Sequence, residues 1–202
     1  MVSLVPPMMP SVPRPTIFLD RDGVINLDKA YVHRWEDFEF VPHAVEAMRM
    51  LVDAGFRIVV ITNQSGIARG MFSDAQYVDL TARIRDYLLA EGVPLLDVLH
   101  CPHHPKGIVP EYAIECGCRK PAPGLLLEAA RRHGIELSQS VLVGDKASDI
   151  FAGRNAGVAC AYLVKSDNEE NVADLKDADA VFDDLYACVR WLLQAHSPAK
   201  NA

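Results

Sequence analysis

Two aspartates follow directly after the first stretch of strand-like sequence in this chain. Residues 16–19 read Thr-Ile-Phe-Leu, and Asp20 and Asp22 come next. In open α/β sheets, ligands gather at the carboxyl ends of the strands. Two carboxylates at such an edge could hold a divalent cation while one attacks an electrophile and the other handles a proton. A lone Asp-x-Asp is usually a charged surface turn, so its meaning depends on what else reaches the same edge.

Other polar side chains stand at comparable places along the chain. Thr62 follows a predicted strand at 56–61, Asp145 follows a predicted strand at 141–143, and Lys120 follows a loop between them. A nucleophile, a hydroxyl, an ammonium group and a second acid suit phosphoryl transfer, in which a protein mainly positions the phosphate and neutralises its charge. Independent surface turns have no reason to supply these groups together.

Strand and helix patterns alternate along the chain. Ser73 and Gln76 form a capping-box signature at the start of one helix pattern. Predicted strands lie at 16–19, 56–61, 96–100, 141–143, 161–164 and 180–182, and predicted helices at 42–54, 73–92, 123–133, 150–156 and 185–195. The alternation predicts a doubly wound α/β fold with a mainly parallel sheet, helices on both faces and right-handed crossovers.

The length and composition are typical of a single domain. The chain has 202 residues and is 50% hydrophobic, enough for a substantial core. We expect one domain at 16–196, a flexible arm at 1–15 that is rich in proline and methionine, and a tail at 197–202. No interval is long enough for an inserted cap domain over the strand ends.

The charge and hydropathy of the chain limit the classes of partner that we expect it to bind. The net charge is -7, whereas a general nucleic-acid or anionic-membrane binder would carry a basic face. No apolar stretch reaches the length of a membrane span, and the opening residues lack the pattern of a signal peptide. We therefore expect a cytoplasmic monomer that acts on a small molecule, with no nucleic-acid or membrane partner.

A cluster of metal-binding residue types lies between residues 101 and 118. Cys101 and His103 form one pair with a single residue between them, and Cys116 and Cys118 form another. Residues i and i+2 of an extended chain point the same way, so each pair can present two donors together. One nitrogen and three sulfurs suit a closed, structural zinc site. The alternatives are a disulfide and free thiols. We see no export signal, and disulfides are rare in the reducing cytosol, so the disulfide is the less favoured alternative.

These motifs carry a resemblance to a known family. The order Asp-x-Asp, Thr, Lys and Gly-Asp-x-x-x-Asp resembles the phosphatases of the haloacid-dehalogenase superfamily, which have a Rossmann-like sheet. The chain is more closely similar to the D-glycero-D-manno-heptose 1,7-bisphosphate 7-phosphatases. The matching segments span residues 16 to 150 and read FLDRDGVIN, AYVH, FEFVP, TNQSGIARG, CPHHP, CGCRKP and VGDKASD.

The resemblance implies roles for the residues that match the family's motifs. Asp20 would be the nucleophile that forms an aspartyl phosphate, and Asp22, kept protonated at neutral pH, would donate a proton to the leaving group and later accept one from water. Mg²⁺ would bind the carboxylates of Asp20 and Asp145 and the backbone carbonyl of Asp22. Thr62 and Lys120 would hold the transferring phosphoryl group.

The resemblance also implies a substrate and the loops that bind it. The substrate would be a heptose bisphosphate that loses its C7 phosphate, leaving heptose 1-phosphate for nucleotide-activated heptose synthesis. Without a cap, specificity would lie in exposed loops. The implied substrate-binding residues are Asp28, Tyr31, Asn63, Gln64, Ser65, Arg119 and Lys146.

Some alternatives stay open at this point. A histidinol-phosphate phosphatase would share the zinc-bearing scaffold, and a catalytically silent, zinc-containing binding module is a reading from another class. Asp149 lies four residues after Asp145. It could support the metal through water, orient Lys120 or Lys146, or be a solvated acid in the first turn of a helix.

Overall fold

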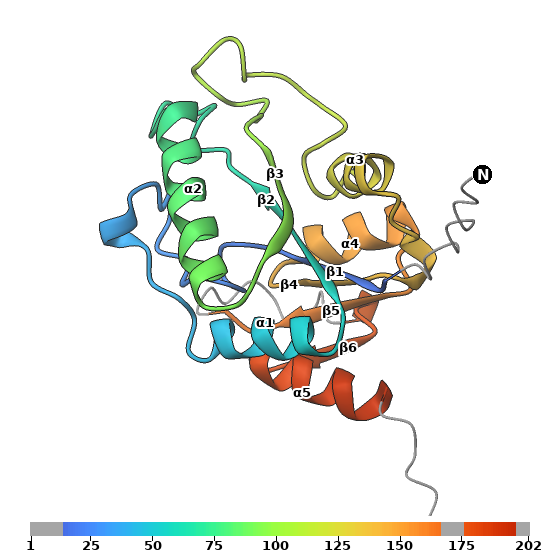
Figure 1. The fold of residues 1–202 in the computed structure, drawn as a ribbon. Helices are drawn as coiled ribbons and strands as arrows, with labels where there is room; N and C mark the ends of the chain where they lie inside the picture. Colours follow the sequence, from blue (N-terminus) through green and yellow to red (C-terminus); the bar gives the residue numbers. More distant parts are fainter. Residues whose placement is uncertain (1–13, 167–175, 197–202) are drawn as a thin grey trace, which may run out of the picture.

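The protein is built around one parallel β-sheet. A computed structural model describes residues 14–166 and 176–196, so most of the expected arm and the whole expected tail lie outside the described residues. The sheet has six strands, in the spatial order β3 (Leu95–Cys101), β2 (Arg57–Asn63), β1 (Thr16–Leu19), β4 (Val141–Gly144), β5 (Cys160–Val164) and β6 (Ala180–Phe182) (Figure 1). This is the strand order of Rossmann-like sheets, so the predicted fold class is confirmed.

Helices cover both faces of this sheet. One face carries α1 (Ala44–Asp53), α2 (Asp74–Ala90) and α5 (Leu185–His196), and the other carries α3 (Gly124–His133) and α4 (Ala147–Ala156). Two short 3-10 helices, Trp35–Asp37 and Leu137–Gln139, were not expected, because a single turn has no hydrophobic periodicity. None of the helices in the described residues is long and apolar enough to span a bilayer.

Local signals set where several helices begin and end. At the start of α2, the Ser73 hydroxyl accepts the Gln76 amide and the Gln76 side chain accepts the Ser73 amide, which confirms the predicted capping box. Gly134 ends α3 and Gly157 ends α4, both in the left-handed conformation that glycine adopts without strain.

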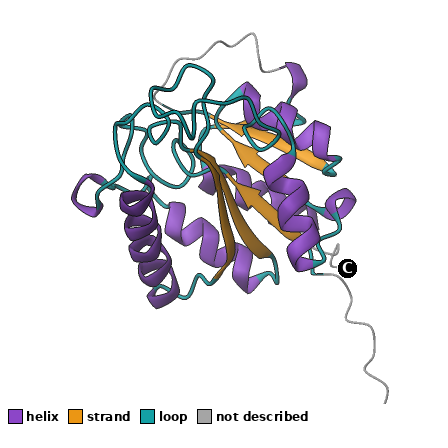
Figure 2. Cartoon of the chain, turned by 90° about the horizontal axis from the view of Figure 1, so that it is seen from above, coloured by secondary structure: helices purple, strands orange, loops and turns teal. Residues whose placement is uncertain are grey.

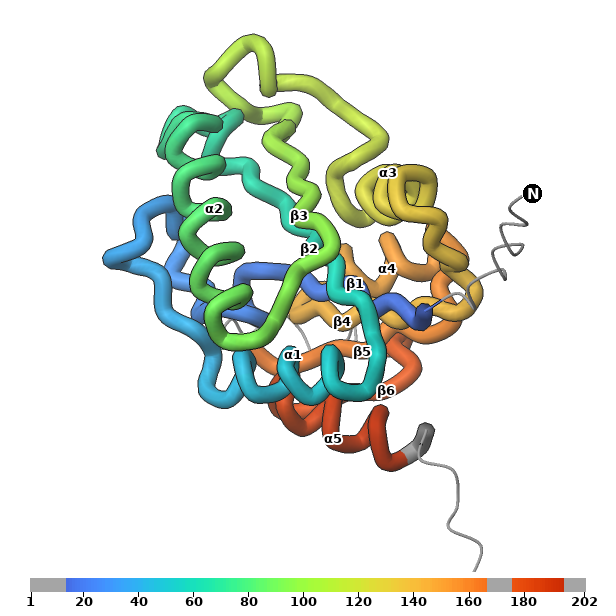
Figure 3. Tube along the Cα trace, in the orientation of Figure 1, coloured from blue at the N-terminus to red at the C-terminus, as the bar shows by residue number. Residues whose placement is uncertain are grey.

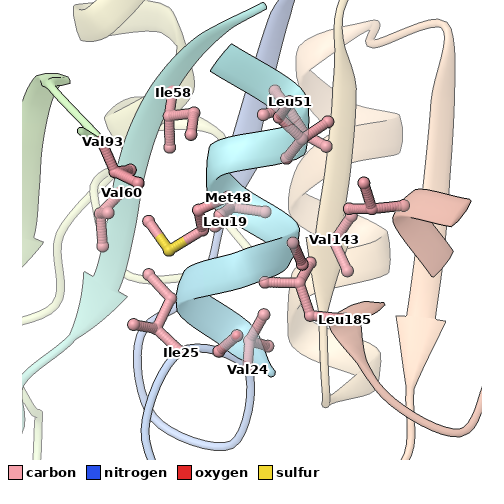
Figure 4. Close-up of a cluster of buried hydrophobic side chains, with 14 of the residues drawn as sticks. Leu19, Val24, Ile25, Met48, Leu51, Ile58, Val60, Val93, Val143 and Leu185 are labelled. Carbon is pink, nitrogen blue, oxygen red and sulfur yellow. The ribbon is translucent and has the colours of Figure 1, made fainter. Parts of the chain in front are cut away.

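The strands are apolar on both sides because helices cover both faces. In β1, Ile17 and Leu19 join the core cluster under α1 and α5, whereas Phe18 points into the cluster under α3 and α4. All three side chains are fully buried. Figure 4 shows the first cluster, in which Met48 of α1 lies among Leu19, Ile25 and other aliphatic side chains.

All strands point the same way, so their carboxyl ends meet at one edge. Asp20 follows β1, Thr62 lies at the end of β2, and Asp145 follows β4. Figure 2 shows the loops gathered at this edge, and Figure 3 shows the segment 102–123 running as a long arch from β3 to α3. Chain order reverses between β1 and β4, which is where open α/β sheets form their crevice.

Met48→Ala tests the core on which this edge rests. Met48 is fully buried, so its truncation leaves a cavity and should lower the free energy of unfolding by about 2–4 kcal/mol, measured by equilibrium urea denaturation. Met71→Ala is the matched control, because Met71 is 56% exposed and the same change there should cost less than about 0.5 kcal/mol. Equal losses in the two variants would contradict this account of the core.

Candidate active site

A pocket of about 250 Å³ opens at the carboxyl edge of the sheet. Its walls come from the loops after β1 and β2, the start of α4 and the loop before α3. The side chains around it are Asp20, Asp22, Asp28, Ala30, Tyr31, Thr62, Asn63, Gln64, Ser65, Gly66, Lys120, Lys146 and Ser148. Every residue proposed from sequence for catalysis or substrate binding therefore lines this pocket, except Arg119.

One buried lysine lies at the centre of the site. The Lys120 ammonium is 2.9 Å from Asp20 Oδ1 and 2.5 Å from Asp149 Oδ1, and it also donates to the carbonyl of Ile61 at 3.0 Å. Burial by itself would lower the pKa of Lys120, but the two carboxylates outweigh it and raise that pKa above its usual value. Lys120 therefore stays charged at neutral pH.

Asp149 is an internal partner of this lysine. Its side chain is only 1% exposed, and its Oδ2 accepts the backbone N–H of Lys146 at 3.1 Å. The alternative of a solvated acid in the first turn of α4 is therefore wrong. A carboxylate buried this deeply would destabilise the fold without a cation beside it, and Lys120 supplies that cation.

The remaining acids carry more negative charge than the site neutralises. Burial raises the pKa of Asp145 to about 8, with the charge of Asp20 adding to the effect. Burial also raises the pKa of Asp20 to about 6, although Lys120 opposes the shift. The Lys146 ammonium, 3.8 Å away, and the side chain of Ser166 oppose the rise for Asp145 only in part, and within the described residues neither buried oxygen of Asp145 meets a donor at hydrogen-bonding geometry.

This arrangement has the donor set of a cation site. Carboxylate oxygens of Asp20, Asp145 and Asp149 lie within 4.8 Å of one another. Oxygen ligands suit a hard divalent ion such as Mg²⁺. Gly23 lets the loop approach this closely, because a Cβ there would lie 2.2 Å from Asp145 Oδ2. Gly23 also has a φ of +89°, which other residues rarely adopt.

Asp22 differs from the expectation that it is protonated at neutral pH. Its carboxylate accepts hydrogen bonds from the guanidinium of Arg21 at 2.8 Å, from Asn26 at 3.0 Å and from Gln64 at 2.8 Å. Burial acts to raise the pKa of Asp22, but these donors outweigh it and the pKa is lowered. These three donors therefore hold Asp22 as a carboxylate.

Sequence reasoning missed the residues that hold Asp22. Arg21 is 3% exposed and also donates to the carbonyl of Val32 at 3.1 Å, which ties Asp22 to the loop at 28–32. Asn26 is fully buried. A cation between two acids in Asp-Arg-Asp was the available signal for Arg21, whereas the contact of Asn26 depends on how the loop folds back.

Asn63 and Gln64 turn their amide groups toward the protein. Asn63 Oδ1 accepts the backbone N–H of Lys120 at 3.0 Å, and Asn63 Nδ2 donates to the carbonyl of the same residue at 3.1 Å. Gln64 Nε2 donates to Asp22 Oδ2 at 2.8 Å and to Thr62 Oγ1 at 2.9 Å. These contacts differ from the free side chains that a sequence-based assignment to substrate binding implies.

The other proposed substrate-binding residues spread around the mouth of the pocket. Lys146 Nζ lies 3.1 Å from Asp28 Oδ2, so this pair spans the opening. Tyr31 is 39% exposed and has a φ of +54°, a strained conformation for a residue with a side chain. Ser65 lines the pocket, whereas the guanidinium of Arg119 donates to the carbonyl of His103 at 3.3 Å.

The predicted cysteine and histidine cluster forms beside this site. Cys118 Sγ lies 3.1 Å from Cys101 Sγ and 3.3 Å from Cys116 Sγ, and His103 Nδ1 lies 3.4 Å from Cys118 Sγ. The cysteines are free thiols, so the disulfide alternative is wrong. The four donor atoms lie within 4.8 Å of one another, as the ligands of a tetrahedral metal ion would.

Comparisons with known proteins agree on one family. A family model described as HAD-hydrolase-like matches residues 117–188. A D-glycero-alpha-D-manno-heptose-1,7-bisphosphate 7-phosphatase of Photorhabdus laumondii is 49% identical over 74% of this chain and 81% of its own length. A D-glycero-beta-D-manno-heptose-1,7-bisphosphate 7-phosphatase of Escherichia coli K12 is 46% identical over 79% of this chain and 86% of its own length.

A solved structure extends the similarity to the fold. The D,D-heptose 1,7-bisphosphate phosphatase of B. bronchiseptica, in complex with magnesium and phosphate, superposes with a TM-score of 0.79 at 33% identity. The superposition covers 90% of this chain and 99% of that chain. The similarity therefore extends over most of this chain.

The charge imbalance generates a prediction about stability. Saturating Mg²⁺ should raise the melting temperature by about 5–10 °C, because the ion binds only the folded carboxylate cluster. Without Mg²⁺ and above about pH 8, where the Asp145 carboxyl ionises, Asp145→Asn should melt higher than the wild type, since it removes a buried charge whose cation partner, Lys146, is 3.8 Å away. The variant should also lose most of the gain with Mg²⁺. Asp149→Asn is the control and should melt lower, because it leaves Lys120 with a single carboxylate partner.

The same experiment has a defined pH dependence. The pKa values of Asp20 and Asp145 rise from 3.8 to about 6 and about 8 on folding, so the folded state holds more protons between these limits. The ion-free protein should therefore lose stability as the pH rises from about 4 to about 8, and Mg²⁺ should cancel this loss. A melting temperature without Mg²⁺ that increases across this window would contradict the raised pKa values.

Proposed function

The chain belongs to the family of haloacid-dehalogenase-like D-glycero-D-manno-heptose-1,7-bisphosphate 7-phosphatases, and we propose that it removes the C7 phosphate of a heptose bisphosphate through an aspartyl phosphate. Its membership makes it a phosphoric monoester hydrolase. The observation that carries the proposal is the pairing of Asp20 with a buried Lys120 beside the carboxylate of Asp145, whose oxygens accept no hydrogen bond within the described residues. A nucleophile, a phosphate-binding cation and a metal-binding acid thus share one small pocket.

The first half-reaction would transfer the phosphoryl group to the protein. A carboxylate oxygen of Asp20 attacks phosphorus, the bond between phosphorus and the C7 oxygen breaks, and its electron pair stays on that oxygen. Asp22 then donates a proton to the alkoxide. Since Asp22 is held as a carboxylate before substrate binds, this proton has to enter together with the substrate or after it.

The second half-reaction would regenerate the nucleophile. A water oxygen attacks the phosphorus of the aspartyl phosphate while Asp22 takes the proton of that water, and the bond between phosphorus and Asp20 breaks to release inorganic phosphate. The hydrogen bonds that lower the pKa of Asp22 favour the carboxylate form that this step requires.

Two residues would hold the transferring oxygens. The Lys120 ammonium stays charged and already lies 2.9 Å from the nucleophile, so it can bind a phosphoryl oxygen with little rearrangement. Thr62 Oγ1 accepts a hydrogen bond from Gln64, which leaves the hydroxyl hydrogen of Thr62 to donate to phosphate.

The residues at the cation site fit a bound Mg²⁺. The carboxylates of Asp20 and Asp145 and the backbone carbonyl of Asp22 would hold the ion, which when bound would neutralise the charge between the nucleophile and the phosphate oxygens. The unpartnered oxygens of Asp145 support this proposal, because a buried carboxylate without a partner is costly.

The sulfur and imidazole cluster fits a structural zinc ion. Cys101, His103, Cys116 and Cys118 would fill four positions and leave none open, so the ion would hold the loop and take no part in the reaction. Lys120 comes two residues after Cys118 in the sequence. The zinc loop would in this way fix the backbone that carries the phosphate-binding ammonium.

The sugar and its second phosphate would lie at the mouth of the pocket. Lys146 would bind the second phosphate, joined by Arg119 if its guanidinium turns from the carbonyl of His103. Asp28 and Tyr31 would contact sugar hydroxyls. The product would be a heptose 1-phosphate, made by a cytoplasmic monomer and used for nucleotide-activated heptose.

Phosphate release with Asp20→Asn as the control tests the reaction. In the presence of Mg²⁺, the wild type should hydrolyse heptose 1,7-bisphosphate, assayed separately as each anomer, in preference to fructose 1,6-bisphosphate and histidinol phosphate. Asp20→Asn removes the nucleophile and should lower kcat by at least about 10⁴-fold. The product should be identified as heptose 1-phosphate by phosphorus NMR spectroscopy.

Three outcomes would change this assignment. A preference for histidinol phosphate would assign the chain to that activity. Loss of the C1 phosphate would overturn the proposed regiochemistry. Residual turnover of Asp20→Asn close to that of the wild type would exclude Asp20 as the nucleophile.

Cys116→Ser tests the structural role of zinc. The purified wild type should contain about one zinc ion per chain, and the variant should bind less and should lose about 10-fold or more in kcat as the loop carrying Lys120 loosens. Cys188→Ser is the matched control, because Cys188 is buried in the core away from the cluster and its substitution should leave the zinc content unchanged. Full activity of a zinc-free Cys116→Ser protein would refute the proposed role.

A further inference from the structure

We propose that Asn63 and Gln64 are positioning residues, which together hold the phosphate-binding lysine, the proton-transferring aspartate and the phosphate-binding threonine in place. This inference rests on the proposed phosphatase function and deepens it. It also replaces the assignment of both residues to substrate binding that their sequence motif implies. The two amides leave few hydrogen-bonding groups for a substrate.

Asn63 fixes the backbone of Lys120. Its amide forms two hydrogen bonds with one residue, accepting from the Lys120 N–H at 3.0 Å and donating to the Lys120 carbonyl at 3.1 Å. Because a backbone N–H can only donate and a carbonyl can only accept, the orientation of the Asn63 amide is determined. The Lys120 ammonium is tied to the same strand, through the carbonyl of Ile61. Both the backbone and the side-chain ammonium of Lys120 are therefore hydrogen-bonded to β2.

Gln64 connects Asp22, which would protonate the leaving group, with Thr62, which would bind the phosphoryl group. Both hydrogens of its Nε2 are used, one on Asp22 Oδ2 at 2.8 Å and one on Thr62 Oγ1 at 2.9 Å. The residue is 3% exposed, and its backbone N–H donates to the carbonyl of Cys101 at 2.8 Å. A substrate could reach only the remaining acceptor of this side chain.

The place of this dipeptide explains how it can serve three groups. Asn63 is the last residue of β2 and is paired with Cys101 in the parallel register of β2 and β3. Cys101 belongs to the sulfur cluster, and Lys120 lies at the far end of the loop that the cluster closes. Asn63 and Gln64 therefore join the end of the sheet, the cluster and the reacting groups through rigid hydrogen bonds.

A positioning role and a ligand role predict different kinetics. Removing a substrate ligand raises KM, whereas misplacing a group that acts on the transferring phosphoryl lowers kcat. Asn63→Asp keeps the shape of the side chain but turns a second carboxylate oxygen toward the Lys120 carbonyl. Gln64→Met keeps the length of the side chain but removes both donors.

Steady-state kinetics of the two variants on heptose 1,7-bisphosphate is the deciding experiment. Each variant should lose about 10–100-fold in kcat while KM stays within about threefold of the wild-type value. Asn155→Asp is the matched control. Asn155 is exposed, and its side-chain amide donates a hydrogen bond to the carbonyl of Pro121 in the same loop, but it contacts no reacting group. Its kcat should stay within about twofold of the wild type.

A second substrate separates the roles of the two residues. A p-nitrophenolate leaving group needs no proton, so the initial burst of p-nitrophenol from p-nitrophenyl phosphate should be less affected by Gln64→Met than turnover of the sugar is. Asn63→Asp acts through Lys120 and should lower both rates alike. Melting temperature and zinc content check that each variant is folded.

The outcomes distinguish this inference from the proposed function. An increase in KM with kcat unchanged in both variants would overturn the inference and restore the substrate-ligand assignment, while the loss of turnover in Asp20→Asn would still support the function. Equal losses of kcat in Asn155→Asp would also overturn it, since they would show a general loosening of the loop. If another phosphate monoester is the preferred substrate, the same measurements on that compound decide between the two roles.

Discussion

The site depends on one buried ammonium surrounded by too many carboxylates. Lys120 is bound to Asp20 and Asp149 inside a pocket that also contains the unpartnered carboxylate of Asp145. Lys120 and the more distant Lys146 do not neutralise the three buried carboxylates, so the folded protein is arranged to take up a cation or protons. A metal ion would supply the missing positive charge, and together with Lys120 it would offset the charge of a bound phosphate.

The parallel sheet is what makes such a concentration of charge possible. The helices pack on the sheet in two apolar clusters, and the polar groups of the site come from beyond the carboxyl ends of β1, β2 and β4, from the loop between β3 and α3, and from the start of α4. The core stabilises the fold independently of the site, which can therefore retain an unfavourable electrostatic arrangement. Gly23 allows the closest approach, where a side chain would collide with Asp145.

The cysteine cluster gives the long arch between β3 and α3 a fixed geometry. A segment of this length without regular structure would be costly to order by its own contacts. Cross-links at Cys101 and Cys118 would shorten its free length and leave Lys120 beside the end of β2. Hydrogen bonds from Asn63 then determine the orientation of that residue. Metal binding and catalytic geometry would thus be linked through the backbone of the arch and the side chain of Asn63.

Hydrophobic periodicity, caps and short spacings are local signals, and they predict the main helices and strands and the parallel fold. The motifs at the strand ends also predict that the acids, the lysine and the cysteine cluster meet at one edge. The hydrogen-bond and ion-pair partners of the individual side chains are visible only in the folded structure. The amide of Asn63 faces a residue 57 positions away, and Asp149 is buried against Lys120. Asp22 receives hydrogen bonds from Asn26 and Gln64 in addition to those from the adjacent Arg21. Contacts of this kind depend on how distant loops pack together, and no local pattern encodes that.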